Sequence, residues 1–450
     1  MSAALEPRVH AWLDRQVEPA GTLGLACSGG SDSTALLLMA ASWAKARGRR
    51  LHILTLDHGL RRESASEVLR VAARAKALGL PCEILSWSGD KPERGLQAAA
   101  RQARHTLLAR ACRSQGIRQL LLGHTQDDQA ETVWMRLEAG GHWRGCSGMA
   151  PVAPSPLWPA GRDLQLLRPL LALRRTKLRD WLTRRGEGWL DDPSNQDEAY
   201  ARIRIRRHLE RLEGAGFPTC RLAALADDLR QVQAQEDWAA AVLARSCIRI
   251  EAWGGARIDA HRLSMAPPAL RYRIWEALSL ALSGQSGLPD RRALDRLDAA
   301  LLATGRVTAA GVLLDVSARG VWMVRDPGPV LGRVDRPAPE LMSQHGDDPV
   351  WDGRFALSSV PASVSPGVLG RDYSGLPERD VLSAIPGFAR PGLLALRRAG
   401  RVVALPGLDD RTAEGGIAEP LFLHRFCTRL LPGQRPVWFD TSESLQPLLQ

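Results

Sequence analysis

The stretch from Thr22 to about Ala139 alternates short apolar runs with longer segments of helical spacing. This alternation is typical of βαβ units, in which helices connect parallel strands and cover both faces of one sheet. The runs LLLG and ILTL are continuously apolar, which indicates strands buried on both faces. The predicted fold class is therefore α/β, with a parallel doubly wound sheet. The expected strands are Leu23–Cys27, Leu51–Leu56, Cys82–Trp87 and Gln119–Leu122, and the expected helices span 33–47, 63–78, 96–114 and 129–138.

Polar residues follow every one of these expected strands. They are the segments SGGSDS (28–33), Asp57-His58, Ser88-Gly89-Asp90 and Gly123-His124. In an open parallel sheet, ligands bind beyond the carboxyl ends of the strands, so four chain segments would deliver polar groups to one rim. Any one of them taken alone could be an ordinary polar loop. Their coincidence at one rim favours a binding site.

The segment SGGSDS joins the first expected strand to a helix. Its two glycines allow close backbone approach to a ligand, and free N–H groups at a helix start favour phosphate. Asp32 would repel a bare phosphate, so we expect it to hold the Mg²⁺ that accompanies a nucleotide, while Ser31 or Asp32 caps the helix. The lysine of a G-x-x-x-x-G-K-[ST] loop is absent. The residues expected to contact the nucleotide are Ser28, Gly29, Gly30, Ser31, Asp32 and Ser33.

A chain of 450 residues should contain about three domains. We predict a catalytic domain over 1–212, a mainly helical middle domain over 213–332 and a small β-rich C-terminal domain over 333–450. The middle region has Leu, Ala and Trp at helical spacing, with a hairpin around Trp253-Gly254-Gly255. The C-terminal region has short strand-like runs at Leu393–Leu396 and Val402–Leu405.

The charge balance, 60 Lys and Arg against 49 Asp and Glu, gives a net charge of +11 and suggests a polyanionic partner, nucleic acid first. A bias toward arginine weakens this inference, since the lysines are only Lys45, Lys76, Lys91 and Lys177. Seven cysteines without a C-x-x-C pair argue against a disulfide framework. The charged N-terminus does not resemble a signal peptide, and the longest apolar run, 35–44, is too short to span a membrane. A cytoplasmic location is expected.

The loop SGGSDS resembles the pyrophosphate-binding loop of the N-type ATP pyrophosphatases, the PP-loop family, which cleave ATP between its α and β phosphates. Five further motifs occur in order: LDHGLR (56–61), AARQAR (99–104), GHTQDDQAET (123–132), RPLL (168–171) and DDPSN (191–195). With them, residues 22–210 resemble the bacterial tRNA(Ile)-lysidine synthetases. The family usually has Tyr where this chain has His105 and Asn where it has Ile203, which puts in doubt a hydrogen bond of that Asn.

The resemblance implies ATP-dependent ligation of free lysine to carbon 2 of the wobble cytidine of tRNA(Ile) with a CAU anticodon. It implies Mg²⁺ on Asp32 and on Asp127, with Asp127 and Asp128 alternatively orienting the lysine amine or accepting its proton. His124 would donate to the α-phosphate or the base oxygen. The remaining implied contacts are Asp57 and His58 with ribose or lysine, and Arg101 and Arg104 with phosphate or base. Gln129 and Glu131 are expected to serve the helix that opens there.

Two other functions remain open on the sequence. A PP-loop tRNA thiolase uses the same adenylation but needs a close cysteine pair, and Cys27 has no cysteine near it in sequence. A nucleic-acid-binding protein with a vestigial nucleotide fold is disfavoured by the intact Asp32, Asp127 and Asp128. We expect the C-terminal domain to recognise tRNA, and a homodimer is the commonest assembly for such a chain.

Overall fold

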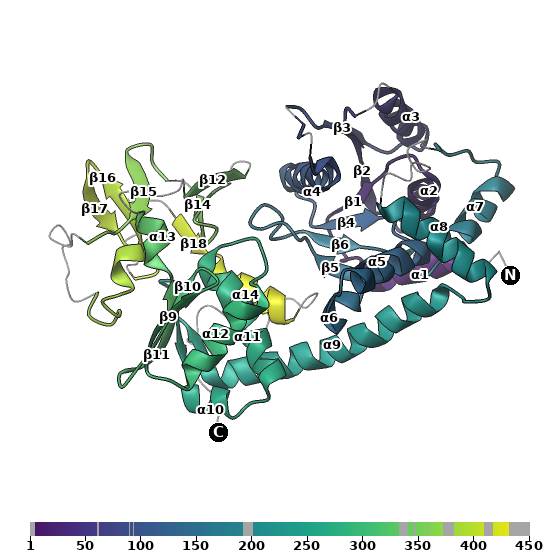
Figure 1. The fold of residues 1–450 in the computed structure, drawn as a ribbon. Helices are drawn as coiled ribbons and strands as arrows, with labels where there is room; N and C mark the ends of the chain where they lie inside the picture. The colour runs from purple at the N-terminus through teal and green to yellow at the C-terminus, as the bar shows by residue number, and fades with distance from the viewer. Residues whose placement is uncertain are drawn as a thin grey trace. The chain divides into compact units, whose positions relative to one another are not determined.

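The computed structural model describes residues 5–60, 63–89, 91–92, 94–191, 201–332, 341–345, 348–358, 360–371, 382–408 and 417–431. Arg61, Asp90 and 192–195, which belong to the motifs above, lie outside the described residues. The chain divides into two compact units, Met1–Ala234 and Gln235–Gln450, each with its own core. Figure 1 shows the elements of both units. This division into two units does not test the two predicted boundaries between three domains, which stay a prediction.

The first unit contains a six-stranded sheet. Its strands are β1 (Thr22–Ala26), β2 (Arg50–Asp57), β3 (Cys82–Ser86), β4 (Gln119–Leu122), β5 (Val152–Pro154) and β6 (Gln165–Leu167). Their order is β3-β2-β1-β4-β6-β5, with parallel pairing from β3 to β6 and antiparallel pairing of β5 with β6. Because β1 pairs with β2 on one side and β4 on the other, the loops after β1 and β4 leave the sheet side by side. This adjacent exit is the switch point where ligands bind in such sheets.

Helices cover both faces of this sheet, as the apolar strands predict. The helices of this unit are α1 (Leu5–Gln16), α2 (Ser31–Ala46), α3 (Ser64–Ala77), α4 (Leu96–Ser114), α5 (Gln126–Glu138), α6 (Trp143–Cys146), α7 (Arg175–Arg184) and α8 (Ala201–Gly214), and α9 (Cys220–Cys247) begins in this unit and ends in the second. Successive residues of β1 point to opposite faces. Leu23 and Leu25 pack with α1, α2, α3 and α7, whereas Ala26 packs with α4. The doubly wound α/β prediction is confirmed.

A smaller apolar cluster joins three helices beside the sheet. Ala130 and Val133 of α5 pack against Ile205 of α8 and Leu222 of α9. The cluster residues Ala130 and Val133 are three apart on α5, and Ile205 and Leu209 are four apart on α8, so each pair lies on one face of its helix. This packing fixes α8 beside the residues that follow β4.

The second unit combines helices with three antiparallel sheets. Its helices are α10 (Ala260–Ser264), α11 (Pro268–Ser283), α12 (Arg291–Leu301), α13 (Pro327–Leu331) and α14 (Phe422–Leu430), with a short 3₁₀ turn at Arg390–Gly392. The first sheet has the order β7-β8-β11-β10-β9, from Ile248–Ile250, Gly255–Ile258, Gly320–Arg325, Val312–Ser317 and Gly305–Ala309. The second has the order β12-β13-β14-β18, from Met342–His345, Asp348–Trp351, Phe355–Ser358 and Ile417–Pro420. The third has the order β15-β16-β17, from Val364–Val368, Leu394–Arg398 and Arg401–Ala404. The helical middle region, the hairpin near Trp253 and the β-rich C-terminal region are confirmed.

One local expectation was wrong, and two strands were not expected. The fourth helix begins at Gln126 rather than residue 129, because Thr125 caps it. Strands β5 and β6 were not predicted, since three-residue strands leave too short an apolar run to recognise. Among the described residues, no helix is both long and apolar enough to cross a membrane.

Candidate active site

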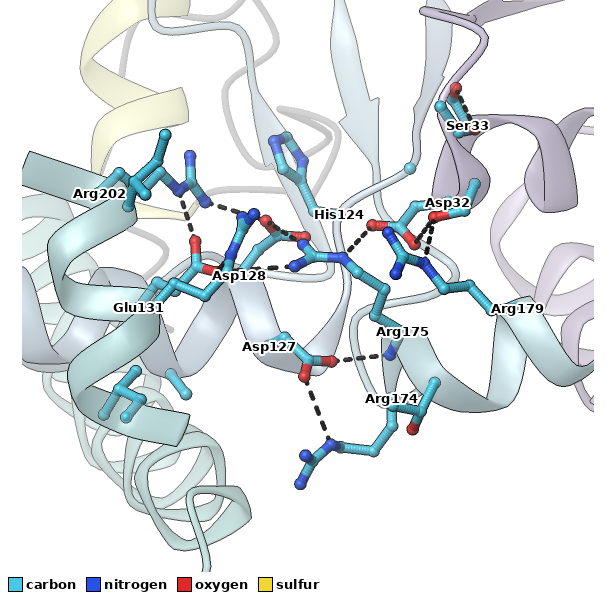
Figure 2. Close-up of a pocket in the computed structure, with 18 of the residues that line it drawn as sticks. Asp32, Ser33, His124, Asp127, Asp128, Glu131, Arg174, Arg175, Arg179 and Arg202 are labelled. Carbon is cyan, nitrogen blue, oxygen red and sulfur yellow. Dashed lines mark hydrogen bonds and ion pairs between the residues drawn. The ribbon is translucent and has the colours of Figure 1, made fainter. Parts of the chain in front are cut away.

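A cavity of about 970 Å³ lies beyond the ends of β1 and β4, within the first unit. Its volume is at the upper end of the range usual for ligand pockets. The lining comes from the 28–33 loop, α4, the start of α5, α7 and α8 (Figure 2). Every cation in this lining is an arginine: Arg104, Arg174, Arg175, Arg179, Arg202, Arg206 and Arg207. The cavity is therefore a polar site where acidic groups from the loops meet arginines from the helices.

The 28–33 loop turns sharply from β1 into α2. Gly29 has φ +84°, a backbone conformation that disfavours residues with a Cβ, and an added Cβ would also displace the Leu190 side chain, whose Cδ1 would lie 2.5 Å away. The Gly29 carbonyl accepts hydrogen bonds from the Leu190 amide at 2.9 Å and from Thr34 Oγ1 at 3.0 Å. Ser28 and Ser33 contact each other, with their hydroxyl oxygens 3.1 Å apart. These contacts hold the loop in one shape over the start of α2.

The start of α2 is open to a ligand. Its N-cap residue is Gly30, which forms no side-chain cap, so the prediction that Ser31 or Asp32 caps the helix is wrong. The Ser31 hydroxyl instead donates to Asp32 Oδ1 at 3.2 Å, and Arg179 Nε donates to that hydroxyl at 3.3 Å. The first N–H groups of a helix have no partner inside it, so uncapped they are available to an anion.

Gly123, at the end of β4, passes close to this loop. A Cβ at that position would lie 3.1 Å from both the amide nitrogen and the Cα of Ser33. We expect Gly123→Ala to displace the loop and weaken binding of a non-hydrolysable ATP analogue about tenfold or more, since overpacking costs about 1–3 kcal/mol. Isothermal titration would measure this. The matched control is Gly145→Ala, where an added Cβ meets no heavy atom within 4 Å. Equal affinities in the two variants would contradict the prediction.

The acidic side of the cavity comes from α5. The Thr125 amide donates to Asp128 Oδ2 at 2.8 Å, and the Asp128 amide donates to Thr125 Oγ1 at 3.4 Å, which together form a capping box; the Thr125 hydroxyl also lies 2.7 Å from Asp128 Oδ2. The other oxygen, Oδ1, accepts from Arg175 Nη2 at 3.0 Å and from Arg202 Nη2 at 3.1 Å. Burial opposes ionisation, but the Arg175 and Arg202 charges prevail and lower the pKa of Asp128 to about 2. Asp128 is thus both a helix cap and an ionised counter-ion.

Glu131 lies one turn further along α5 and is 2% exposed. Its carboxylate accepts from Arg202 Nε at 2.6 Å and from Arg206 Nε at 2.7 Å, and Arg175 Nη1 is 3.7 Å away. Glu131 thus joins α5 to α8, a role that the sequence did not predict, and its expected favourable effect near the positive end of α5 stays a prediction. The other expected helix residue, Gln129, exchanges hydrogen bonds with the backbone of Met149.

Arg175 connects the glycine loop to these acids (Figure 2). Its Nε donates to Asp32 Oδ2 at 2.8 Å, and its amide donates to Asp127 Oδ2 at 2.7 Å. Burial raises the pKa of Asp32, and the Arg175 charge limits that rise. Asp127 is more open, with 23% of its side chain exposed, and lies 3.4 Å from Arg174 Nε. The structure therefore brings Asp32, Asp127 and Asp128 together around one arginine.

His124 and Arg104 form another part of the cavity lining. Burial lowers the pKa of His124 to about 3 despite the nearby Asp128, so its imidazole is neutral at physiological pH. A neutral imidazole donates one hydrogen bond without bringing charge. His105 is likewise neutral, because burial and then the Arg101 charge lower its pKa to about 4. Arg104 forms no ion pair with any described residue, so its guanidinium is available to an anion.

Asp57 and His58 do not belong to the cavity lining. The Asp57 carboxylate accepts from the Gly59 amide at 2.8 Å and the Ser64 hydroxyl at 2.5 Å, which ties the loop after β2 to α3. Burial, with the Arg104 charge next, lowers the pKa of His58. Contacts of these two residues with ribose or lysine stay a prediction.

The sequence did not reveal Arg174, Arg175 and the pair Arg202–Arg206 as parts of the site. Arg174 binds Glu213 with two hydrogen bonds of 2.7 and 2.9 Å at the far end of the cavity. Arg202 and Arg206 are four residues apart, a spacing that puts them on one helix face and was readable in ARIRIRR. Ile203, where the resembled family usually has Asn, is buried and lines the cavity.

The carboxylates of the cavity suit a magnesium ion only when a bound nucleotide supplies further oxygen ligands. Carboxylates are the groups that Mg²⁺ prefers, and it usually takes one or two of them together with substrate phosphates. Among the residues that the structure describes, no group of three or more His, Cys, Asp or Glu side chains could hold a metal ion. Asp32 and Asp127 therefore fit a magnesium ion that arrives with a nucleotide, not a ready-made metal cage.

Sulfur chemistry finds no support in this cavity. No cysteine is among its lining residues, and Cys27, next to the loop, is buried. Burial raises the pKa of the Cys27 thiol, which makes it a poor nucleophile. The thiolase alternative is not favoured.

The fold and the loop define a class: the PP-loop domain family matches residues 2–213, so this is an ATP-binding PP-loop protein. The chain is 38% identical over 399 residues to the tRNA(Ile)-lysidine synthase of Caulobacter vibrioides, covering 86% of this chain and 88% of the relative. It is 40% identical to that of Methylobacterium nodulans, covering 70% and 94%. The relative from Hyphomonas neptunium is 42% identical, and the match spans 52% of this chain and 63% of the relative. The chain belongs to the tRNA(Ile)-lysidine synthase family, as its motifs predict.

Proposed function

We propose that this protein joins free lysine to carbon 2 of the wobble cytidine of tRNA(Ile) with a CAU anticodon. In the first step, the cytidine O2 attacks the α-phosphorus of ATP and pyrophosphate leaves. In the second step, the ε-amine of lysine attacks carbon 2, AMP leaves with the former O2, and the amine loses a proton. The products are lysidine, AMP and pyrophosphate.

One observation carries this proposal within the family. Uncapped N–H groups at the start of α2 lie in the same cavity as Asp32, Asp127, Asp128 and His124. The N–H groups suit phosphates, and the three aspartates with His124 suit a metal ion and an amine. A reaction that adenylates a base and then displaces AMP by an amine needs both sets in one place.

The residues divide between the two steps. We assign Asp32 to magnesium, which supplies positive charge to the phosphates when bound. Asp127 is the most open of the three aspartates, so it can take part in the metal site, orient the lysine ammonium or accept its proton. Asp128 is fixed by Thr125, Arg175 and Arg202, which suits a fixed negative charge near the amine. His124 and Arg104 can donate to the base oxygen or the phosphate.

The other parts of the proposal concern recognition. We infer that the region predicted as the C-terminal domain, 333–450, binds tRNA away from the anticodon, because contacts in one loop discriminate poorly between tRNAs. The net charge of +11 supports a nucleic-acid partner. A cytoplasmic location follows from these substrates, and a homodimer stays a prediction.

Incorporation of radiolabelled lysine tests the proposal. With ATP present, tRNA(Ile) bearing CAU should become labelled, and the CAU-bearing methionine tRNA should stay unlabelled. Omitting ATP should abolish labelling. Pyrophosphate release without lysine incorporation would overturn the assigned acceptor or amine while leaving the PP-loop class intact.

A further inference from the structure

Asp32 has a single counter-ion among the described residues. Arg175 Nε lies 2.8 Å from Asp32 Oδ2, and the only other side chain in hydrogen-bond contact with this carboxylate is the Ser31 hydroxyl. Both members of the pair are 16% exposed. An ionised carboxylate at this burial needs a cation close by. Arg175 supplies that cation in the structure.

The other acids that Arg175 touches are not dependent on it. Asp128 also contacts Arg202, and Glu131 also contacts Arg202 and Arg206. Withdrawal of the Arg175 guanidinium would therefore leave Asp128 and Glu131 paired and leave Asp32 bare. Asp32 Oδ2 is therefore the carboxylate oxygen at which another cation could replace the Arg175 guanidinium.

The guanidinium can leave while its backbone stays in place. The amide of Arg175 donates to Asp127 Oδ2 at 2.7 Å, and Leu178 and Leu182 anchor α7 in the core that contains α2. Rotation about side-chain bonds alone would move the charged group within the cavity. A guanidinium released there suits phosphate oxygens, which it binds through two N–H groups at once.

We propose that Arg175 is an internal counter-ion that occupies the metal-binding oxygen of Asp32 until a magnesium nucleotide takes that oxygen over. The inference rests on the proposed function for the assignment of magnesium to Asp32. Free metal ions are then excluded, because Arg175 already neutralises the carboxylate. A metal ion bound to a nucleotide is admitted, because the phosphates bring the negative charge that accepts the displaced guanidinium.

Manganese, a paramagnetic substitute for magnesium, makes the exchange measurable without any turnover. Electron paramagnetic resonance would titrate free Mn²⁺ with the nucleotide-free full-length protein. We expect wild-type protein to bind Mn²⁺ weakly alone and about tenfold or more tightly with a non-hydrolysable ATP analogue. Arg175→Gln should bind Mn²⁺ alone about tenfold or more tightly than wild type, since a like charge within about 4 Å opposes a second cation strongly.

Three variants control the experiment. Arg175→Lys keeps the charge and should keep Mn²⁺ out. Arg47→Gln removes an arginine that pairs with Asp14 of α1, outside the cavity, and should bind Mn²⁺ like wild type. In Arg175→Gln combined with Asp32→Asn, the gained binding should disappear.

The proposal is overturned if Arg175→Gln binds Mn²⁺ no better than wild type, or if the gained binding survives Asp32→Asn. Tight binding of Mn²⁺ to wild-type protein without nucleotide would also overturn the proposal. This measurement uses wild-type protein, so it does not depend on whether any variant folds. None of these arms uses lysine or tRNA. If the lysine-incorporation assay failed, the Mn²⁺ titrations would therefore still test whether Arg175 blocks the metal site.

Discussion

Replacing Asp32 with asparagine is expected to reduce ATP-dependent pyrophosphate release by about a thousandfold or more. The change keeps the shape of the side chain and removes the charge that we assign to magnesium. A metal ion that neutralises phosphate charge contributes several kcal/mol to such a transition state, and each 1.36 kcal/mol is tenfold in rate. Binding of tRNA should be nearly unchanged, since tRNA affinity comes mainly from phosphate contacts elsewhere on the protein. Pyrophosphate release and filter binding of tRNA would measure the two effects.

Asp14→Asn is the matched control for this variant. Asp14 is also an arginine-paired aspartate of the first unit, with Arg47 Nη2 at 2.8 Å, but it lies on α1 and does not line the cavity. Its replacement should leave pyrophosphate release within about twofold of wild type. Retained turnover in Asp32→Asn would refute the metal role. Equal losses in both variants would point to folding instead.

Replacing Glu131 with glutamine is expected to loosen α8 and destabilise the first unit by about 3 kcal/mol. Removing one partner of a buried ion pair costs about 3–5 kcal/mol, and the lower end applies because Arg202 and Arg206 are 37% and 27% exposed. Hydrogen exchange of residues 201–214 should accelerate more than that of α2. Thermal unfolding of the full chain should begin at a lower temperature.

Glu138→Gln provides the comparison, because Glu138 lies on the same helix and its carboxylate accepts, among the residues that the structure describes, only an exposed hydrogen bond from Trp134 Nε1 at 2.7 Å. Surface changes of this kind are usually within about 0.5 kcal/mol. Unchanged exchange in the α8 peptides of Glu131→Gln would show that the apolar contacts of Ile205 and Leu209 alone hold the helix.

Four of the six strands of the sheet could be predicted from the sequence because they are continuous apolar runs with a helix after each. The predicted strands agree with β1 to β4 within one residue. Helix starts were less predictable. The T-x-x-D pattern of Thr125 and Asp128 is a capping signal that locates the start of α5 at Gln126, three residues before the predicted start. At α2, serine and aspartate lie where caps usually do, yet Arg179 and Arg175 hold their side chains.

The glycine loop was predictable because its residues are contiguous, and the acidic residues because they follow strand ends. The arginine partners were not, because they come from far along the chain: Arg175 lies 143 residues from Asp32, and Arg202 lies 71 residues from Glu131. No local spacing links such residues. Only packing of α7 on α2, and of α8 on α5, brings them together.

All cations in the cavity lining are arginines, and this has a chemical consequence for the adenylated cytidine of the proposed reaction. Adenylated cytidine is an electrophile that any nearby deprotonated amine would attack, and a lysine side chain in the cavity would be consumed in a covalent dead end. None of Lys45, Lys76, Lys91 and Lys177 lines the cavity. Guanidinium groups remain protonated and do not act as nucleophiles. In the proposed reaction, the arginines of the lining can therefore face the adenylated cytidine without being modified by it, which leaves the amine of the free amino acid as the nucleophile.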